Sequence, residues 1–223
     1  EYLPVFPEDH NLFLLHLHSL ANLNQKEKVH DYLHKISVSS QHLLSVINDV
    51  LDMSQIKQSK IHLNCVSVHV EELIDQIASI MVSQSKDAGL NFVIEKSAFE
   101  HPQFVGDLLR IKQILINLLS NAFKFTMEGG RVTFRTEEIP AAVPGKVRYR
   151  FCVADTGIGM SQEFQERLFE PFIRSESVVR VEGTGRGLSI TKGLVDLMGG
   201  NISVESKLHQ GNIKWKTFSP SGG

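Results

Sequence analysis

Two asparagines, Asn117 and Asn121, stand four residues apart in an otherwise strongly apolar stretch. The apolar spacing of residues 107–125 predicts a helix, and residues four apart on a helix lie on the same face. Amide oxygens are hard ligands, suited to a Mg²⁺ ion that keeps several waters and shares the phosphates of a nucleotide. Lys124, one turn beyond Asn121, would then pair with a phosphate. The alternative is a helix whose two asparagines are solvated or act as caps.

Two glycine-rich segments follow this helix. Residues 155–160, Asp-Thr-Gly-Ile-Gly-Met, come after a strand-like run, and their glycines would let the backbone approach a ligand closely. The carboxylate of Asp155 in this turn would accept an exocyclic amine hydrogen of adenine. Residues 183–188, Gly-Thr-Gly-Arg-Gly-Leu, open another predicted helix, where free N–H groups would bind phosphate oxygens. A simple turn and a flexible hinge are the respective alternatives.

Together the three segments supply a metal-binding amide, a base-reading carboxylate and a phosphate-binding loop, which is the combination that an ATP site requires. The last loop has neither the dinucleotide fingerprint nor the P-loop spacing, because no Lys-Ser or Lys-Thr pair follows it. Four basic side chains are candidate phosphate partners, although each one alone is more often a solvated charge. They are Lys124, Arg174, Arg180 and Arg186.

The elements that must position these residues begin with one long helix, predicted over residues 26–58. Its apolar side chains recur at three- and four-residue steps and form a narrow stripe, which is typical of a helical hairpin or bundle. Residues 8–23 would form the antiparallel partner helix, joined through a short polar turn. The stripe predicts a homodimer. It consists of Val29, Leu33, Ile36, Ser40, Leu43, Ile47, Val50 and Leu51.

Beyond residue 60, predicted strands and helices are interleaved. The strands are expected at 60–68, 91–95, 131–138, 146–154, 201–206 and 213–218, and the helices at 71–88, 107–125, 161–169 and 188–198. Because residues 131–154 are typical of a hairpin, we expect an α+β fold, a two-layer α/β sandwich, rather than a doubly wound parallel sheet. The predicted domains are a helical hairpin over 1–58 and an ATP-binding domain over 59–223.

Composition and net charge limit the class of protein to which the chain can belong. The chain has 223 residues and a net charge of −2, so it lacks the basic character that nucleic-acid binding requires. Its two cysteines, Cys65 and Cys152, lie in strand-like runs and are expected to be buried thiols in a reducing compartment. No apolar run approaches the roughly 20 residues of a membrane span. We therefore expect a cytoplasmic domain, attached to a membrane only through a segment of a longer parent protein.

At this point five segments, in a fixed order, resemble sensor histidine kinases of the hybrid type. Residues 39–54 are similar to the second helix of that family's hairpin, and residues 107–126 resemble its N box. Residues 155–160 resemble the first glycine box, residues 168–172 the F box, and residues 183–190 the second glycine box. Since these matches cover most of the chain, the resemblance is specific.

The resemblance implies an ATP-dependent protein histidine kinase of two-component signalling. It assigns Mg²⁺ to Asn117 and Asn121, the phosphate and base side to Lys124 and Phe125, and adenine to Asp155. Residues 173–186 would be an ATP lid. Arg174 would lie near the γ-phosphate and act in catalysis with Asn117 and Lys124. The other implied ATP-binding residues are Gly157, Gly159, Phe172, Gly183, Thr184, Gly185, Gly187 and Leu188. A response-regulator receiver domain is the implied partner.

The sequence departs from the family in two places that matter. Arg186 replaces the usual leucine of the second glycine box. More seriously, no Ser-His-Asp/Glu-x-Arg-Thr-Pro stretch is present, so no phospho-acceptor histidine is recognisable. The register of the first helix would place that histidine near Val5. His10, preceded rather than followed by acidic residues, is a weak candidate.

Three functions therefore remain in competition. The first is a histidine kinase core that binds Mg-ATP. The second is a non-catalytic homodimeric signalling module that binds nucleotide but lacks the acceptor histidine. The third is another ATPase of the same wider fold, in which a glutamate activates water at the place of Asn117. The asparagine at this position and the long helix argue against the third.

Overall fold

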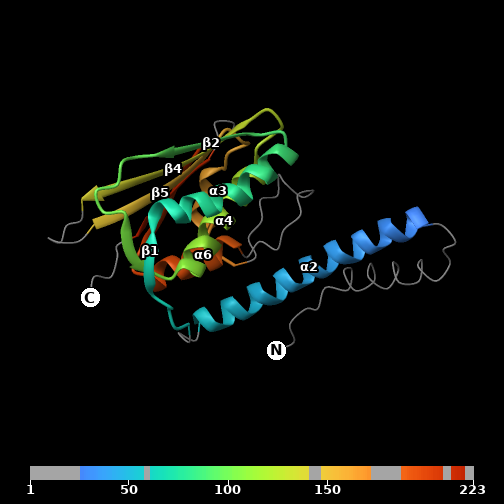
Figure 1. Cartoon of the computed structure of the whole chain (residues 1–223), viewed down its shortest axis with the longest axis horizontal. Helices are drawn as coiled ribbons and strands as arrows, with labels where there is room; N and C mark the ends of the chain where they lie inside the picture. The colour runs from blue at the N-terminus through green and yellow to red at the C-terminus, as the bar shows by residue number, and fades with distance from the viewer. Residues whose placement is uncertain (1–25, 58–60, 141–146, 172–186, 208–211, 219–223) are drawn as a thin grey trace. The chain divides into compact units, whose positions relative to one another are not determined.

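The computed structural model describes residues 26–57, 61–140, 147–171, 187–207 and 212–218, and Figure 1 shows their elements. The chain separates into two compact units, Glu1–Ser54 and Gln55–Gly223. Helix α2 (Lys26–Lys57) supplies the described part of the first unit as far as Ser54, and it confirms the predicted long helix. The first arm of the expected hairpin lies outside the described residues. Within the part of the chain that is described, no helix combines the length and apolarity needed to cross a membrane.

The second unit is built on a five-stranded sheet with the order β2-β4-β5-β7-β6. Strand β2 pairs in parallel with β4, whereas the other neighbours pair antiparallel. A separate two-stranded sheet joins β1 and β3. The bounds are β1 (Val66–His69), β2 (Asn91–Lys96), β3 (Gln103–Gly106), β4 (Arg131–Pro140), β5 (Val147–Asp155), β6 (Asn201–Ser206) and β7 (Asn212–Phe218).

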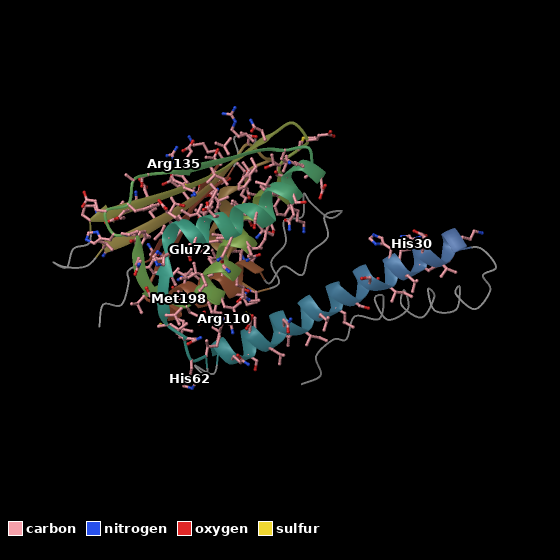
Figure 2. The ribbon with its side chains drawn as sticks, viewed as in Figure 1. His30, His62, Glu72, Arg110, Arg135 and Met198 are labelled. Atoms are coloured by element: carbon pink, nitrogen blue, oxygen red, sulfur yellow. The ribbon has the colours of Figure 1, made fainter. Side chains whose placement is uncertain are left out.

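Three helices pack together against one face of the larger sheet and form the second layer (Figure 1). They are α3 (Val70–Asp87), α4 (Leu108–Phe125) and α6 (Gly187–Leu197). The short helix α5 (Gln162–Arg167) follows β5. The opposite face of the sheet is polar, as Arg135 illustrates (Figure 2), with its guanidinium 2.6 Å from a Glu95 oxygen. The expected two-layer α+β arrangement is thus confirmed.

Helix α4 forms because its apolar residues recur with helical spacing and because its first turn is capped. The Asp107 carboxylate accepts a hydrogen bond from the backbone N–H of Arg110 at 3.0 Å. Its other oxygen accepts one from the backbone N–H of Asn64, also at 3.0 Å. One buried carboxylate therefore begins the helix and anchors the segment that precedes β1.

Side chains of β4 and β5 point alternately into the core between the two layers and away from it, as expected of half-buried strands. Phe134 and Phe151 stack across the two strands with ring centroids 6.3 Å apart. Tyr149 is fully buried and its hydroxyl donates to the backbone oxygen of His101. Burial, followed by the nearby Glu138 carboxylate, raises the pKa of Tyr149 to about 12. The tyrosine therefore stays neutral and ties the segment before β3 to the core.

Some expectations were wrong in detail. Residues 61–65 do not pair in a strand, because the Asn64 N–H is held by Asp107 and β1 begins only at Val66. Cys65, expected to be buried, is exposed. Cys152 is buried, and burial raises the pKa of its thiol to about 11, so it stays protonated at neutral pH. Strand β3 was not predicted at all.

Candidate functional site

Helix α4 carries the two asparagines on one face, as the spacing predicted. Both are partly exposed, and the Nδ2 atom of Asn121 lies 3.4 Å from the Oδ1 atom of Asn117, to which it donates. The other side of the helix is locked into the core by seven buried residues. They are Ile111, Ile114, Leu115, Leu118, Leu119, Ala122 and Phe123. Rotating the helix to turn the amides away would expose this apolar face.

The first end of the site lies where Asn117 meets helix α6. Its Nδ2 atom donates to the hydroxyl oxygen of Thr191 at 2.7 Å, and Thr191 is only 1% exposed. The backbone of Gly187, at the start of α6, lies directly against the same amide. A Cβ atom on Gly187 would be 2.5 Å from Asn117 Oδ1 and 2.9 Å from its Nδ2. A side chain at position 187 would therefore force the Asn117 amide to move.

The second end of the site is the loop after β5. Asp155 is 7% exposed, and its Oδ1 atom accepts a hydrogen bond from the backbone N–H of Gly157 at 2.9 Å. The backbone oxygen of Phe125, the last residue of α4, accepts from the N–H of Ile158 at 3.2 Å. A Cβ atom on Gly157 would collide with that same oxygen. Gly159 has a φ of 72°, which favours glycine.

The far end of this loop is held by α5 and β6. The backbone N–H of Met160 donates to the Ser206 hydroxyl at 2.8 Å. The Gln165 side chain donates to the backbone oxygens of Met160 at 3.1 Å and Ser206 at 2.9 Å. Sequence reasoning missed these supports, together with Thr191, because their partners lie far away in the sequence. Helix α5 is itself capped by Ser161, whose hydroxyl accepts a hydrogen bond from the backbone N–H of Phe164 at 3.2 Å.

Lys124 lies on the exposed side of α4, near its end. Its ammonium is 5.5 Å from the centroid of the Phe125 ring, within the range of a cation–π contact. Phe125 itself is half-buried and Leu188 is half-buried at the start of α6. The helix thus brings a cation and an aromatic ring to the same end of the site as Asp155.

The structure gathers seven of the expected site residues on or around α4. They are Asn117, Asn121, Lys124, Phe125, Asp155, Gly157 and Gly187. The two anchoring positions on α4, 117 and 125, are eight residues apart, or about 12 Å along the helix. The expected residues Phe172, Arg174, Gly183, Thr184 and Gly185 lie outside the described residues, as do Arg180, Arg186 and the whole of the expected lid.

The donor set suits a nucleotide and a hard cation. Two amides offer oxygens of the kind that Mg²⁺ prefers, next to a helix N-terminus of the kind that binds phosphate. A carboxylate held by a backbone N–H stands at the opposite end. Arg110 (Figure 2) lies outside this arrangement, at the beginning of α4, where it donates to Gln113 Oε1 at 2.8 Å.

Comparison with known proteins shows the family of the chain. The profile of the family described as "Histidine kinase-, DNA gyrase B-, and HSP90-like ATPase" matches residues 106–220. The signal transduction histidine-protein kinase BarA of Escherichia coli (strain K12) is 36% identical over 187 residues, which cover 83% of this chain and 20% of BarA. The sensory/regulatory protein RpfC of Xanthomonas campestris pv. campestris (strain 8004) is 34% identical over 198 residues, 88% of this chain and 27% of RpfC. The chain thus spans 27% or less of these relatives' length.

Solved structures show the same relationship. Full-length ShkA, crystallised in complex with AMPPNP, aligns with a TM-score of 0.74 and 31% identity over 98% of this chain and 47% of ShkA. The Acinetobacter baumannii histidine kinase AdeS aligns over 96% of both chains with a TM-score of 0.71. Its identity is 18%, so it shows the fold alone.

Because the profile covers more than half of its residues, the chain belongs to the histidine kinase-, DNA gyrase B- and HSP90-like ATPase family. Its second unit is an ATP-binding domain of the kind found in that family. The likeness to BarA, RpfC and ShkA narrows this to the catalytic domain of a sensor histidine kinase, which confirms the resemblance seen in the motifs.

Proposed function

We propose that this chain is the core of a protein histidine kinase, which binds Mg-ATP and transfers the γ-phosphoryl group to a histidine. One observation carries the proposal. Helix α4 holds the Asn117–Asn121 pair against the start of α6 at one end, and the Asp155 loop against Phe125 at the other. The printed name of BarA, a histidine-protein kinase, and the AMPPNP complex of ShkA support it.

We propose the following role for each residue of the site. Asn117 and Asn121 would hold Mg²⁺, which supplies positive charge to the phosphates when bound. Gly157 N–H fixes one oxygen of Asp155, so that the other would accept the amine hydrogen of adenine. Lys124 and Phe125 would face the phosphates and the base. The proposal completes the site with Gly159, Phe172, Arg174, Gly183, Thr184, Gly185, Gly187 and Leu188.

The amide at position 117 favours phosphoryl transfer over hydrolysis. An amide cannot take a proton from water, whereas a glutamate at this place could act as a general base. Phosphoryl transfer needs mainly positioning and charge stabilisation, which the proposed residues supply. The histidine that accepts the phosphoryl group must then lie outside the residues of this site.

Replacing Asn121 with alanine tests the proposed metal and nucleotide site. We expect Asn121→Ala to abolish Mg-ATP binding, a loss larger than the roughly 10- to 100-fold typical of residues that only support a ligand. Calorimetric titration with ATP in the presence of Mg²⁺ measures it. Asn91→Ala, at an exposed asparagine that begins β2, is the matched control and should bind as the wild type does. An Asn121→Ala chain with unchanged nucleotide affinity would contradict the assignment.

A second function is favoured by one sequence observation: no histidine lies within a recognisable phospho-acceptor motif. The chain would then be a non-catalytic homodimeric module that binds nucleotide.

Incubation with γ-labelled ATP separates the two functions. The kinase predicts acid-labile label on a histidine of the chain, absent from the Asn121→Ala variant because the donor no longer binds. Nucleotide binding without any label would support the module instead. Release of inorganic phosphate without protein label would point to a hydrolase and contradict both.

We also propose that α2 forms a homodimer. Much of the stripe defined above is exposed in the single chain: Leu33 and Leu43 are each 56% exposed. Ile47, Val50 and Leu51 are exposed as well, next to Leu44. A continuous apolar row of this kind on a helix needs a partner surface to leave water.

Placing a charge in this row should separate the dimer. We expect Leu43→Glu to raise the dimer dissociation constant by ~100-fold, because an unpaired carboxylate would be buried at the interface. His34→Glu, at an exposed position of α2 off the stripe, is the control and should leave the dimer intact. Sedimentation equilibrium measures both, and a wild-type chain that is monomeric at micromolar concentration would count against the dimer.

A response-regulator receiver domain is the proposed downstream partner. The histidine kinase ThkA in complex with the response regulator protein TrrA aligns with 96% of this chain at a TM-score of 0.67. At 22% identity that likeness shows the fold alone, so the partner rests on the proposed kinase function.

A further inference from the structure

We infer that Thr191 is a positioning residue for the proposed Mg²⁺ site: its hydroxyl sets which way the Asn117 amide points, and through it the Asn121 amide. The inference rests on the proposed function, because it concerns the same metal ligands. Thr191 lies on α6, 74 residues beyond Asn117, and is not part of any motif noticed in the sequence.

The contact itself is short and shielded. Asn117 Nδ2 lies 2.7 Å from Thr191 Oγ1, and the threonine is 1% exposed. In this contact the Thr191 hydroxyl oxygen is the acceptor and the Asn117 amide nitrogen is the donor. A buried polar group that loses its partner is costly, so this acceptor favours the amide nitrogen strongly over the amide oxygen at this place.

The direction of the Asn117 amide then sets that of Asn121. With its nitrogen turned to α6, Asn117 directs its oxygen along α4, where it accepts from Asn121 Nδ2 at 3.4 Å. An amide carries oxygen and nitrogen on opposite branches, so Asn121 offers its own oxygen on the side away from Asn117. A carbonyl oxygen has two lone pairs, which leaves Asn117 Oδ1 able to accept further.

This direction matters for a cation. An amide oxygen can ligate Mg²⁺, whereas an amide nitrogen is a donor and repels it. Gly187 borders the Asn117 amide on one side, where helix α6 begins. A flip of the amide that exchanges its oxygen and nitrogen is the change that the bond to Thr191 opposes.

Removing only the hydroxyl tests this role. Thr191→Val keeps the shape of the side chain but offers no acceptor. We expect the affinity of the nucleotide complex for Mg²⁺ to fall roughly 10- to 100-fold, the range for residues that orient a metal ligand. Nucleotide affinity without metal should change by less than about twofold. Thr191→Ser, which restores the hydroxyl, should return Mg²⁺ affinity to near the wild-type value.

Thr136→Val is the matched control. Thr136 is a fully buried threonine on β4, and its hydroxyl oxygen has no hydrogen-bond partner within the described part of the chain. It lies four residues along β4 from Val132, which pairs with Asp155. The same substitution there should leave Mg²⁺ affinity unchanged and should not lower the unfolding temperature. If valine at position 191 prevents folding, Thr191→Ala takes its place, since alanine also lacks the acceptor and favours helix.

The readout is ATP affinity by calorimetry over a series of Mg²⁺ concentrations. A wild-type chain without Mg²⁺-dependent binding overturns the proposed function, and this inference with it. A wild-type chain that binds, alongside a hydroxyl-free variant with unchanged Mg²⁺ affinity, overturns the inference alone. A variant that loses metal-free and metal-dependent binding equally, or a serine variant that fails to recover, also overturns it.

Discussion

The burial of one face of α4 is the constraint on which the rest of the domain depends. Seven of its residues are buried against α3, α6 and the sheet, and each large apolar side chain buried contributes about 1.5–3 kcal/mol. That sum fixes the rotation of the helix about its own axis. The opposite face, with Asn117 and Asn121, is therefore held at the site without any ligand, so the amides are preorganised rather than recruited.

Two close approaches of backbone to α4 then bring distant segments to this helix. Gly187 lies against the Asn117 amide, and Gly157 lies against the Phe125 carbonyl. A side chain at position 157 would collide with the Phe125 carbonyl, and one at position 187 would displace the Asn117 amide. Because both contacts are made to one rigid helix, the loop after β5 and the start of α6 are kept at a fixed separation. The glycines of the motifs serve this packing as well as the proposed ligand.

Local patterns predicted the elements but not all of their partners. The helical spacing of residues 107–125 and the hairpin of 131–154 were sufficient for α4 and for the β4–β5 pair. The parallel pairing of β2 with β4 and the existence of β3 depend on long-range register, which no local pattern encodes. The asparagine pair was predicted because its spacing is local. Thr191, which contacts the pair from another helix, was not predicted because that contact is long-range. The bond between Asp107 and Asn64 is also long-range, and because of it β1 begins later than the sequence predicted.

The most direct test of the central claim is to map Mg-ATP onto the folded chain by following its amide resonances in solution during a titration. The account predicts saturable shifts concentrated at the side-chain amides of Asn117 and Asn121 and at the backbone amides of Asp155 to Gly159. Resonances from the outer face of the sheet, around Arg135, should stay unchanged. Saturable shifts confined to that outer face, or none at millimolar nucleotide, would contradict the account.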